Sequence, residues 1–183
     1  MLVEIAHPAF DVDIALAYAG ADNFMGQPVY RNARCWLHSD AAAALARAIV
    51  LAEEQGLRLK IYDAFRPSEA QWALWHHTPD PDYVADPRRG SPHSRGVAID
   101  LTLVDGDGNE LDMGGPVDDL TPNGHHDAPG LASAARRNRL LLLGLMTAAG
   151  WDWYVREWWH YQLFRPRDYP VLSDRAAGTA MMG

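Results

Sequence analysis

Apolar residues alternate with small or polar residues most regularly between positions 96 and 103. Every second residue from Val97 to Leu103 is apolar, and the alternate positions from 96 to 102 hold glycine, alanine, a single acid, Asp100, and threonine. A period of two is typical of a strand with one buried face. Burying an unpaired carboxylate among apolar and small residues would be costly. We therefore expect this strand to present Asp100 to a cation.

Three further segments have the spacing and the boundary residues of helices. Ser39 or Asp40 can cap the first helix, and Gly56 can end it. Ser68 opens the second, and leucines recur at helical spacing in the third until Gly150 closes it. The predicted helices cover residues 41–55, 68–75 and 131–149.

Short strands, turns and loops account for most of the remaining chain. Residues 57–61 alternate into a strand, and the final strands begin at Trp151. Residues 105–109 are rich in Asp and Gly, which predicts a tight hairpin turn. The polar, proline-rich stretch 77–90 predicts a loop, and an irregular tail follows Arg165. This order indicates an α+β fold in which a small antiparallel sheet carries the metal site and packs against several helices.

Composition limits the kind of partner that this chain can bind. Its 183 residues fit a single domain, residues 1–183, and the formal net charge of -8 argues against nucleic acid. The basic run at 136–139 is interpreted as the water-facing side of a helix. The single cysteine, Cys35, requires no oxidising compartment. With no secretory signal and no apolar membrane span, we expect a soluble, cytoplasmic protein of open oligomeric state.

Two histidines and one carboxylate form the candidate metal site. His93 lies in the loop before the Asp100 strand and can reach the same ion, and His160 completes the set. Two imidazoles and a carboxylate are a usual three-ligand set for a catalytic metal with an open position. Glu157 lies three residues before His160, a spacing that would place the two on opposite faces of a regular strand. We therefore expect Glu157 on a turn, as a base beside the metal, and His160 at the start of a strand.

Other interpretations of these residues remain open at this stage. The same ligand set describes the facial triad of non-haem iron oxygenases, which usually have double-sheet barrels. A non-catalytic module could also hold zinc for structure alone. His125 and His126 are competing ligands, but their loop is rich in Pro, Gly, Asn and Asp, and we expect them to be exposed.

Several motifs together resemble a known peptidase family. The pattern Ser91-x-His93-x-x-Gly96-x-Ala98-x-Asp100, followed by Glu157-Trp158-Trp159-His160, is similar to the VanX-type D-alanyl-D-alanine dipeptidases. These are zinc peptidases related to D-Ala-D-Ala carboxypeptidases and murein endopeptidases. The resemblance covers most of the chain from about Tyr18 to Tyr161. It extends through the segments 22–26, 62–67 and 112–118.

The resemblance implies an activity and a role for each site residue. It implies hydrolysis of D-Ala-D-Ala to two D-alanines by water activated on one zinc ion per chain. The substrate would be a small dipeptide with an ammonium at one end and a carboxylate at the other. By resemblance, the zinc ligands are His93, Asp100 and His160, the general base is Glu157, the oxyanion donor is Arg66, and the substrate-binding residues are Tyr18, Ser91 and Asp118.

Two alternatives concern Arg66 and the length of the substrate. Arg66 could instead form a surface salt bridge, for example with Asp63. A related D,D-carboxypeptidase or endopeptidase would act on longer peptidoglycan peptides, which require an open groove. A dipeptidase would close both ends of a small pocket.

Overall fold

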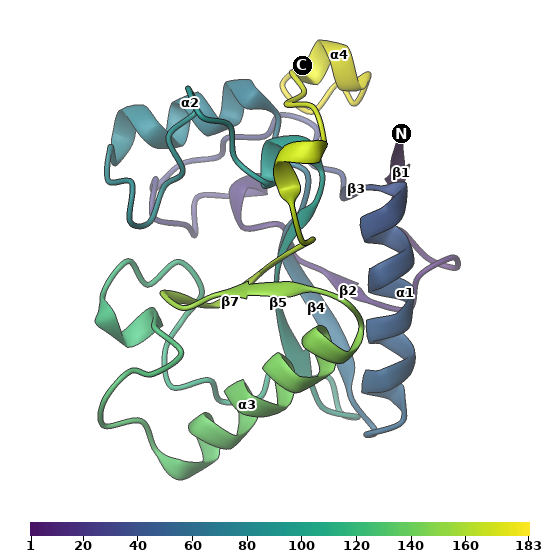
Figure 1. Ribbon diagram of the computed structural model, residues 1–183, viewed down its shortest axis with the longest axis vertical. Helices are drawn as coiled ribbons and strands as arrows, with labels where there is room; N and C mark the ends of the chain where they lie inside the picture. The colour runs from purple at the N-terminus through teal and green to yellow at the C-terminus, as the bar shows by residue number, and fades with distance from the viewer.

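A five-stranded sheet runs through the computed structural model, which describes residues 1–183 (Figure 1). Strand β4 (Arg58–Asp63) lies parallel to the short edge strand β2 (Asp13–Ile14), and all other neighbouring strands of this sheet are antiparallel. The predicted α+β class with an antiparallel sheet is confirmed, with one parallel pair at its edge. In spatial order the strands are β2 (Asp13–Ile14), β4 (Arg58–Asp63), β5 (Ala98–Val104), β7 (Glu157–Gln162) and β6 (Asp152–Tyr154).

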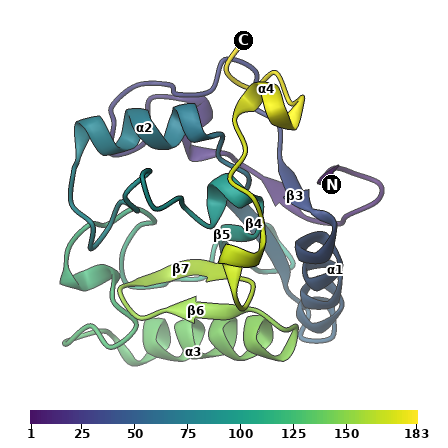
Figure 2. The ribbon, with the colours of Figure 1, turned by 45° about the horizontal axis from the view of Figure 1, so that its top comes forward.

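Helices α1 (Ser39–Glu53) and α3 (Ser133–Ala148) cover the apolar face of this sheet. Figure 2 shows α3 running alongside β6 and β7. The alternating apolar residues of β5, such as Ile99 and Leu101, are fully buried against these helices. The predicted positions of these helices are confirmed within two residues at each end. Asp100 consequently points to the opposite face of the sheet, away from the main core.

Helix α2 (Ser68–His77) belongs to a second apolar cluster on the other side of the sheet. β1 (Leu2–Glu4) and β3 (Trp36–His38) form a separate antiparallel pair. α1 is capped by His38, whose Nδ1 accepts from the Asp40 amide, so the predicted cap at Ser39 or Asp40 is wrong by one or two residues. The second cluster contains Tyr18, Tyr30, Phe65, Ala70, Leu74, Val84 and Met181.

The C-terminal tail is more ordered than its sequence indicates. It forms a short helix, α4 (Asp174–Ala177), and Met181 is fully buried in the second cluster. The Asp174 carboxylate accepts from the Thr179 hydroxyl and the Met181 amide, which folds the tail back on itself. Four 3₁₀ turns complete the structure: η1 (Ala17–Ala19), η2 (His93–Arg95), η3 (Pro122–Gly124) and η4 (Pro166–Asp168).

The basic run on α3 does not lie wholly in water as predicted. Arg136 and Arg137 are exposed, but Arg139 is only 1% exposed. The Arg139 guanidinium donates to the carbonyls of Met113, Asn123 and His125, which satisfies all three of its nitrogens. Burial is tolerated because each of the three nitrogens donates to an acceptor. No helix in the structure has both the length and the apolarity needed to cross a bilayer.

Candidate active site

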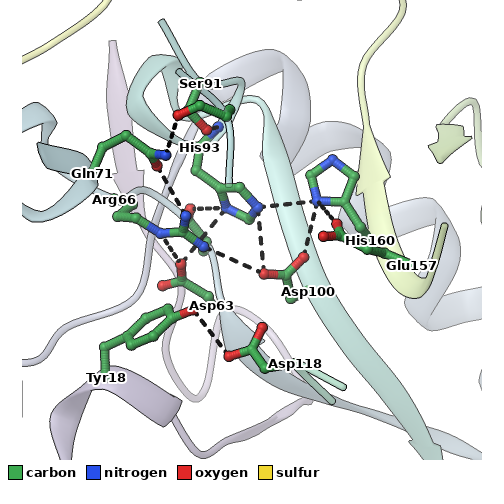
Figure 3. A network of polar contacts seen from close by, with 12 residues as sticks. Tyr18, Asp63, Arg66, Gln71, Ser91, His93, Asp100, Asp118, Glu157 and His160 are labelled. Carbon is green, nitrogen blue, oxygen red and sulfur yellow. Dashed lines mark hydrogen bonds and ion pairs between the residues drawn. The ribbon is translucent and has the colours of Figure 1, made fainter. Parts of the chain in front are cut away.

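His93, Asp100 and His160 converge on one point at the polar face of the sheet (Figure 3). Asp100 and His160 are directly opposed in the ladder between β5 and β7. His93 enters from η2, and Gly96 then turns the chain into β5 with a φ of 68°. A Cβ at Gly96 would lie 2.7 Å from a Leu2 methyl carbon, so glycine is required there. All three side chains are at most 9% exposed.

The outer nitrogens of both imidazoles are engaged by oxygen acceptors. His93 Nδ1 lies 2.8 Å from the Ala64 carbonyl oxygen, and His160 Nε2 lies 3.2 Å from Gln162 Oε1. Acceptors at these positions hold the ring protons on the outer nitrogens. His93 Nε2 and His160 Nδ1 therefore face each other as bare nitrogens 3.1 Å apart, beside the Asp100 carboxylate. Two imidazole nitrogens and a carboxylate at these distances from one another can bind one divalent cation.

Electrostatics within the cluster keep Asp100 charged and favour a proton on His160 until a cation displaces it. Burial by itself would raise the pKa of Asp100, but His93 and His160 bring that pKa well below its usual range. Burial would likewise lower the pKa of His160, and the contacts with Asp100 and Glu157 outweigh it and raise that pKa. The carboxylate is thus held in its charged form, as a metal ligand must be.

Glu157 lies beside the cluster, but not on a turn as predicted. It is the first residue of β7, directly after the turn at Val155 and Arg156, where the pairing of β6 with β7 is irregular. Strict alternation of faces does not hold at this irregular start, and Glu157 Oε2 reaches to 3.8 Å from His160 Nδ1. Burial raises the pKa of Glu157 to about 8, because burial and repulsion from Asp100 and Asp118 outweigh the attraction of His160. A carboxyl of raised pKa next to a metal site can accept and return a proton near neutral pH.

Arg66 is held rigidly at the inner side of the site. Its Nε donates to Asp63 Oδ2 at 2.8 Å and its Nη1 to Gln71 Oε1 at 2.9 Å. Arg66 Nη2 lies 3.7 Å from Asp100 Oδ2, and the guanidinium stacks over the Tyr18 ring at 5.1 Å. The suggested pairing with Asp63 does exist, but it is buried rather than on the surface. The guanidinium is thus a fixed positive charge beside the ligand cluster.

Asp118, Tyr18 and Ser91 line the remainder of the site. The Tyr18 hydroxyl donates to Asp118 Oδ2 at 3.0 Å, and Ser91 Oγ accepts from the His93 amide at 3.2 Å. Asp118 adopts a φ of 60°, a strained conformation that in a non-glycine residue often marks a functional position. Burial, followed by repulsion from Asp100, raises the pKa of Asp118 to about 7.

One cavity of about 270 Å³ is lined by the candidate ligands, Glu157, Arg66 and the three predicted substrate-binding residues. Its walls come from the N-terminal loop, β5, the segment around Asp118, β7 and the loop after α2. The site residues predicted from the sequence that line it are Tyr18, Arg66, Ser91, His93, Asp100, Asp118, Glu157 and His160.

The competing histidines lie away from this cavity, but they are not exposed as predicted. His125 and His126 are half-buried, and the Nε2 atom of each is inaccessible and unpaired. The His126 ring packs edge-on against Trp153 at 5.0 Å. Loop composition did not reveal this packing, because the contact partner comes from a strand about thirty residues later.

Two residues outside the predicted site, Asp63 and Gln71, hold Arg66 in place. Asp63 accepts from both Arg66 and the Tyr30 hydroxyl, and Gln71 connects Arg66 to the Ala85 carbonyl. Asp63 lies within the segment 62–67 that carries the family resemblance, so a signal was present. Gln71 gave no such signal, since a glutamine within a helix is ordinary.

Comparison with known proteins agrees with this geometry. Residues 1–172 match the Peptidase M15 family described as D-ala-D-ala dipeptidase. The chain belongs to this family. It is 49% identical to a D-alanyl-D-alanine dipeptidase of Escherichia coli K12, over 95% of this chain and 90% of the relative. It is 37% identical to the D-alanyl-D-alanine dipeptidase of Enterococcus faecium, over 84% of this chain and 86% of the relative. It is also 37% identical to the D-alanyl-D-alanine dipeptidase of Streptomyces coelicolor, over 80% of this chain and 83% of the relative.

Membership of the family makes this protein a metallopeptidase. The cluster of His93, Asp100 and His160 is the possible metal site that such an enzyme requires. The iron oxygenase and the non-catalytic module are therefore set aside.

Proposed function

We propose that residues 1–183 form one zinc dipeptidase domain that hydrolyses D-Ala-D-Ala to two D-alanines. The observation that carries the proposal is the pair of bare imidazole nitrogens beside Asp100, within 4.8 Å of one another. Imidazole and carboxylate ligands with an open position suit zinc. Zinc held by His93, Asp100 and His160 would supply the Lewis acidity that makes a water nucleophilic near neutral pH.

Glu157 is the general base in this proposal. Its carboxylate lies beside His160 and takes the proton of the attacking water. It then gives that proton to the leaving amine, since the same group must act as base and as acid in successive steps. Its raised pKa supports both roles, because a catalytic group of this kind is most effective near the operating pH.

Arg66 stabilises the negative charge that develops on the former carbonyl oxygen. Asp63 and Gln71 fix its guanidinium before substrate arrives, and a preorganised donor of this kind contributes about 3 kcal/mol to the transition state. Asp118 pairs with the substrate ammonium, and Tyr18 holds the Asp118 carboxylate. Ser91 offers its hydroxyl proton to the substrate carboxylate, since its oxygen already accepts from the His93 amide.

Hydrolysis of a peptide panel by metal-loaded protein tests this function. The panel contains D-Ala-D-Ala, L-Ala-L-Ala, both mixed-chirality dipeptides and N-acetyl-D-Ala-D-Ala, with a chelator-treated sample in parallel. We expect alanine release from D-Ala-D-Ala alone, lost with chelator and restored by zinc. Preference for the acetylated peptide would contradict the ammonium site at Asp118 and favour a carboxypeptidase.

Glu157→Gln separates metal binding from catalysis. Glutamine keeps the size of the side chain but cannot accept the proton, so turnover should fall by about 10²–10⁴-fold. Bound zinc should stay at one ion per chain, measured by elemental analysis. Turnover at the wild-type rate would show that Glu157 is not the base.

A further inference from the structure

The loop between α2 and η2 forms one wall of the cavity. Pro81, Asp82, Tyr83, Val84 and Ala85 all line it. The inner end of this wall is fixed, because Val84 is 3% exposed in the second apolar cluster and the Ala85 carbonyl accepts from Gln71. The outer end, around Asp82, is exposed.

The outer end of this wall is joined to the turn between β6 and β7. The Tyr154 hydroxyl donates to the Asp82 carbonyl at 3.1 Å, and Arg156 forms an ion pair with the Asp82 carboxylate. Tyr154 also lines the cavity, facing the same space as Glu157 and His160. We call the three residues Asp82, Tyr154 and Arg156 the rim bridge. It connects two walls that are far apart in sequence at the edge of the cavity.

We propose that the rim bridge determines which peptide lengths this enzyme accepts. The inference rests on the proposed dipeptidase function. With the bridge closed, the cavity of about 270 Å³ lies at the lower limit of the roughly 300–1,000 Å³ typical of small-molecule sites, which suits a very small ligand. A peptide extended beyond two residues has to separate Asp82 from Tyr154 and Arg156 before it can reach the metal ligands.

The contacts of the rim bridge are individually weak, so substitutions can remove them one at a time. The side chains of Arg156 and Asp82 are 37% and 55% exposed, and an ion pair at such exposure is weak and screened by salt. The Tyr154 contact uses the Asp82 backbone, so it survives loss of the carboxylate. The bridge therefore favours short peptides by a modest factor, and selection should weaken as each contact is removed.

Arg156→Ala, alone and combined with Tyr154→Phe, tests this inference in the zinc-loaded enzyme. The measured quantity is kcat/KM for N-acetyl-D-Ala-D-Ala and for D-Ala-D-Ala-D-Ala, each divided by kcat/KM for D-Ala-D-Ala. Arg156→Ala should raise at least one of these ratios about fivefold, the most that an exposed pair contributes, and the double variant should raise it further. Arg156 does not line the cavity, so D-Ala-D-Ala turnover by the single variant should stay within about threefold of wild type.

Arg88→Ala is the matched control. Arg88 lies in the same loop and pairs with Asp86, but that pair lies within the loop and does not reach β6 or β7. Its removal should leave both ratios unchanged. Exchanging the charges, with Asp82→Arg and Arg156→Asp in one chain, should restore the wild-type preference. Thermal unfolding of each variant shows that any change comes from a folded enzyme.

The outcomes separate this inference from the proposed function. If wild-type enzyme cleaves D-Ala-D-Ala but the ratios of Arg156→Ala and of the double variant equal those of wild type, the rim bridge is wrong and the dipeptidase assignment stands. If wild-type enzyme releases no alanine from D-Ala-D-Ala, the proposed function and the length selection both fail. Equal ratios in Arg88→Ala and Arg156→Ala, both above wild type, would show loosening of the loop rather than loss of the bridge.

Discussion

Asp100 and His160 occupy directly opposed positions in β5 and β7, with Asp100 Oδ1 3.0 Å from His160 Nδ1. Directly opposed residues of an antiparallel pair have Cβ atoms about 4.5–5.5 Å apart, so the sheet register itself holds the two ligands together. Only His93 comes from outside a strand, and the Ala64 carbonyl orients its ring. The metal site is therefore largely formed before an ion binds.

Zinc should therefore stabilise the folded chain, and Asp100→Asn should remove most of that stabilisation. A ligand that binds only the folded state at about 1,000 times its Kd contributes about 4 kcal/mol. Asparagine keeps the volume of the side chain but not the charge that balances the ion. The measurement is the zinc-dependent rise in Tm of both proteins after chelator treatment. An equal rise in Asp100→Asn would remove this carboxylate from the ligand set.

Tyr18→Phe should weaken substrate binding more than it slows turnover. The variant deletes the hydroxyl that donates to Asp118, and a hydrogen bond to a charged group contributes about 1.5–3 kcal/mol. We expect KM for D-Ala-D-Ala to rise about 10- to 100-fold, with kcat much less affected and the zinc content unchanged. Steady-state kinetics with metal analysis measures all three.

Tyr161→Phe is the control for that variant. Tyr161 is fully buried on β7, and its hydroxyl has no hydrogen-bond partner. Loss of this oxygen should leave KM unchanged. A similar rise in KM in both variants would mean that Tyr18 acts through packing rather than through Asp118.

Local pattern was sufficient to predict the main elements and the orientation of Asp100. Alternation from Val97 to Leu103 predicted β5 and its polar face, and leucine spacing predicted α3. The convergence of Tyr18, Arg66 and Asp118 on the metal ligands did not follow from spacing. It followed from the family resemblance, because contacts between segments about 50–100 residues apart leave no periodic signal in one sequence.

The wrong predictions have specific physical causes. The separation of three residues between Glu157 and His160 led to the prediction that Glu157 lies on a turn. The pairing of β6 with β7 is irregular, which lets a strand residue reach His160, and no local sequence pattern reveals this irregularity. The basic run at 136–139 indicated a solvated helix face. Arg139 is buried instead, because three carbonyls from a distant loop satisfy it.

Arg139→Lys should therefore loosen the segment that carries Asp118. The carbonyls of Met113, Asn123 and His125 flank this segment, and the planar guanidinium contacts all three at once. Lysine keeps the charge but cannot reproduce that fork. We expect a loss of about 3 kcal/mol in the free energy of unfolding, because buried carbonyls lose their donors, and a higher KM. Denaturant unfolding and steady-state kinetics measure the two effects.

Arg137→Lys on the same helix is the control for this substitution. Arg137 is exposed, and exposed substitutions usually change stability by less than about 0.5 kcal/mol. Equal losses of stability in the two variants would show that helix α3, rather than the loop contacts, responds to the change. A stability loss in Arg139→Lys without any rise in KM would separate the loop from substrate binding.

His126 should make the protein less stable in mild acid. Burial, followed by repulsion from Arg139, lowers the pKa of His126 to about 4, whereas an unfolded histidine titrates near 6.5. Between these values the unfolded chain binds the proton and the folded chain does not, so the free energy of unfolding falls as pH drops from about 6.5 to about 4. The shift corresponds to at most about 3 kcal/mol, and less because the ring is partly solvated.

His126→Phe should remove that part of the pH dependence. Phenylalanine preserves the edge-on contact with Trp153 but cannot bind a proton. Denaturant unfolding at pH 7, 6, 5 and 4 should give a flatter decline for this variant than for wild type. His76→Phe, an exposed replacement on α2, is the control and should retain the wild-type decline. If His126→Phe declined as steeply as wild type, the acid sensitivity would come from other groups, because this ring would then titrate alike in both states.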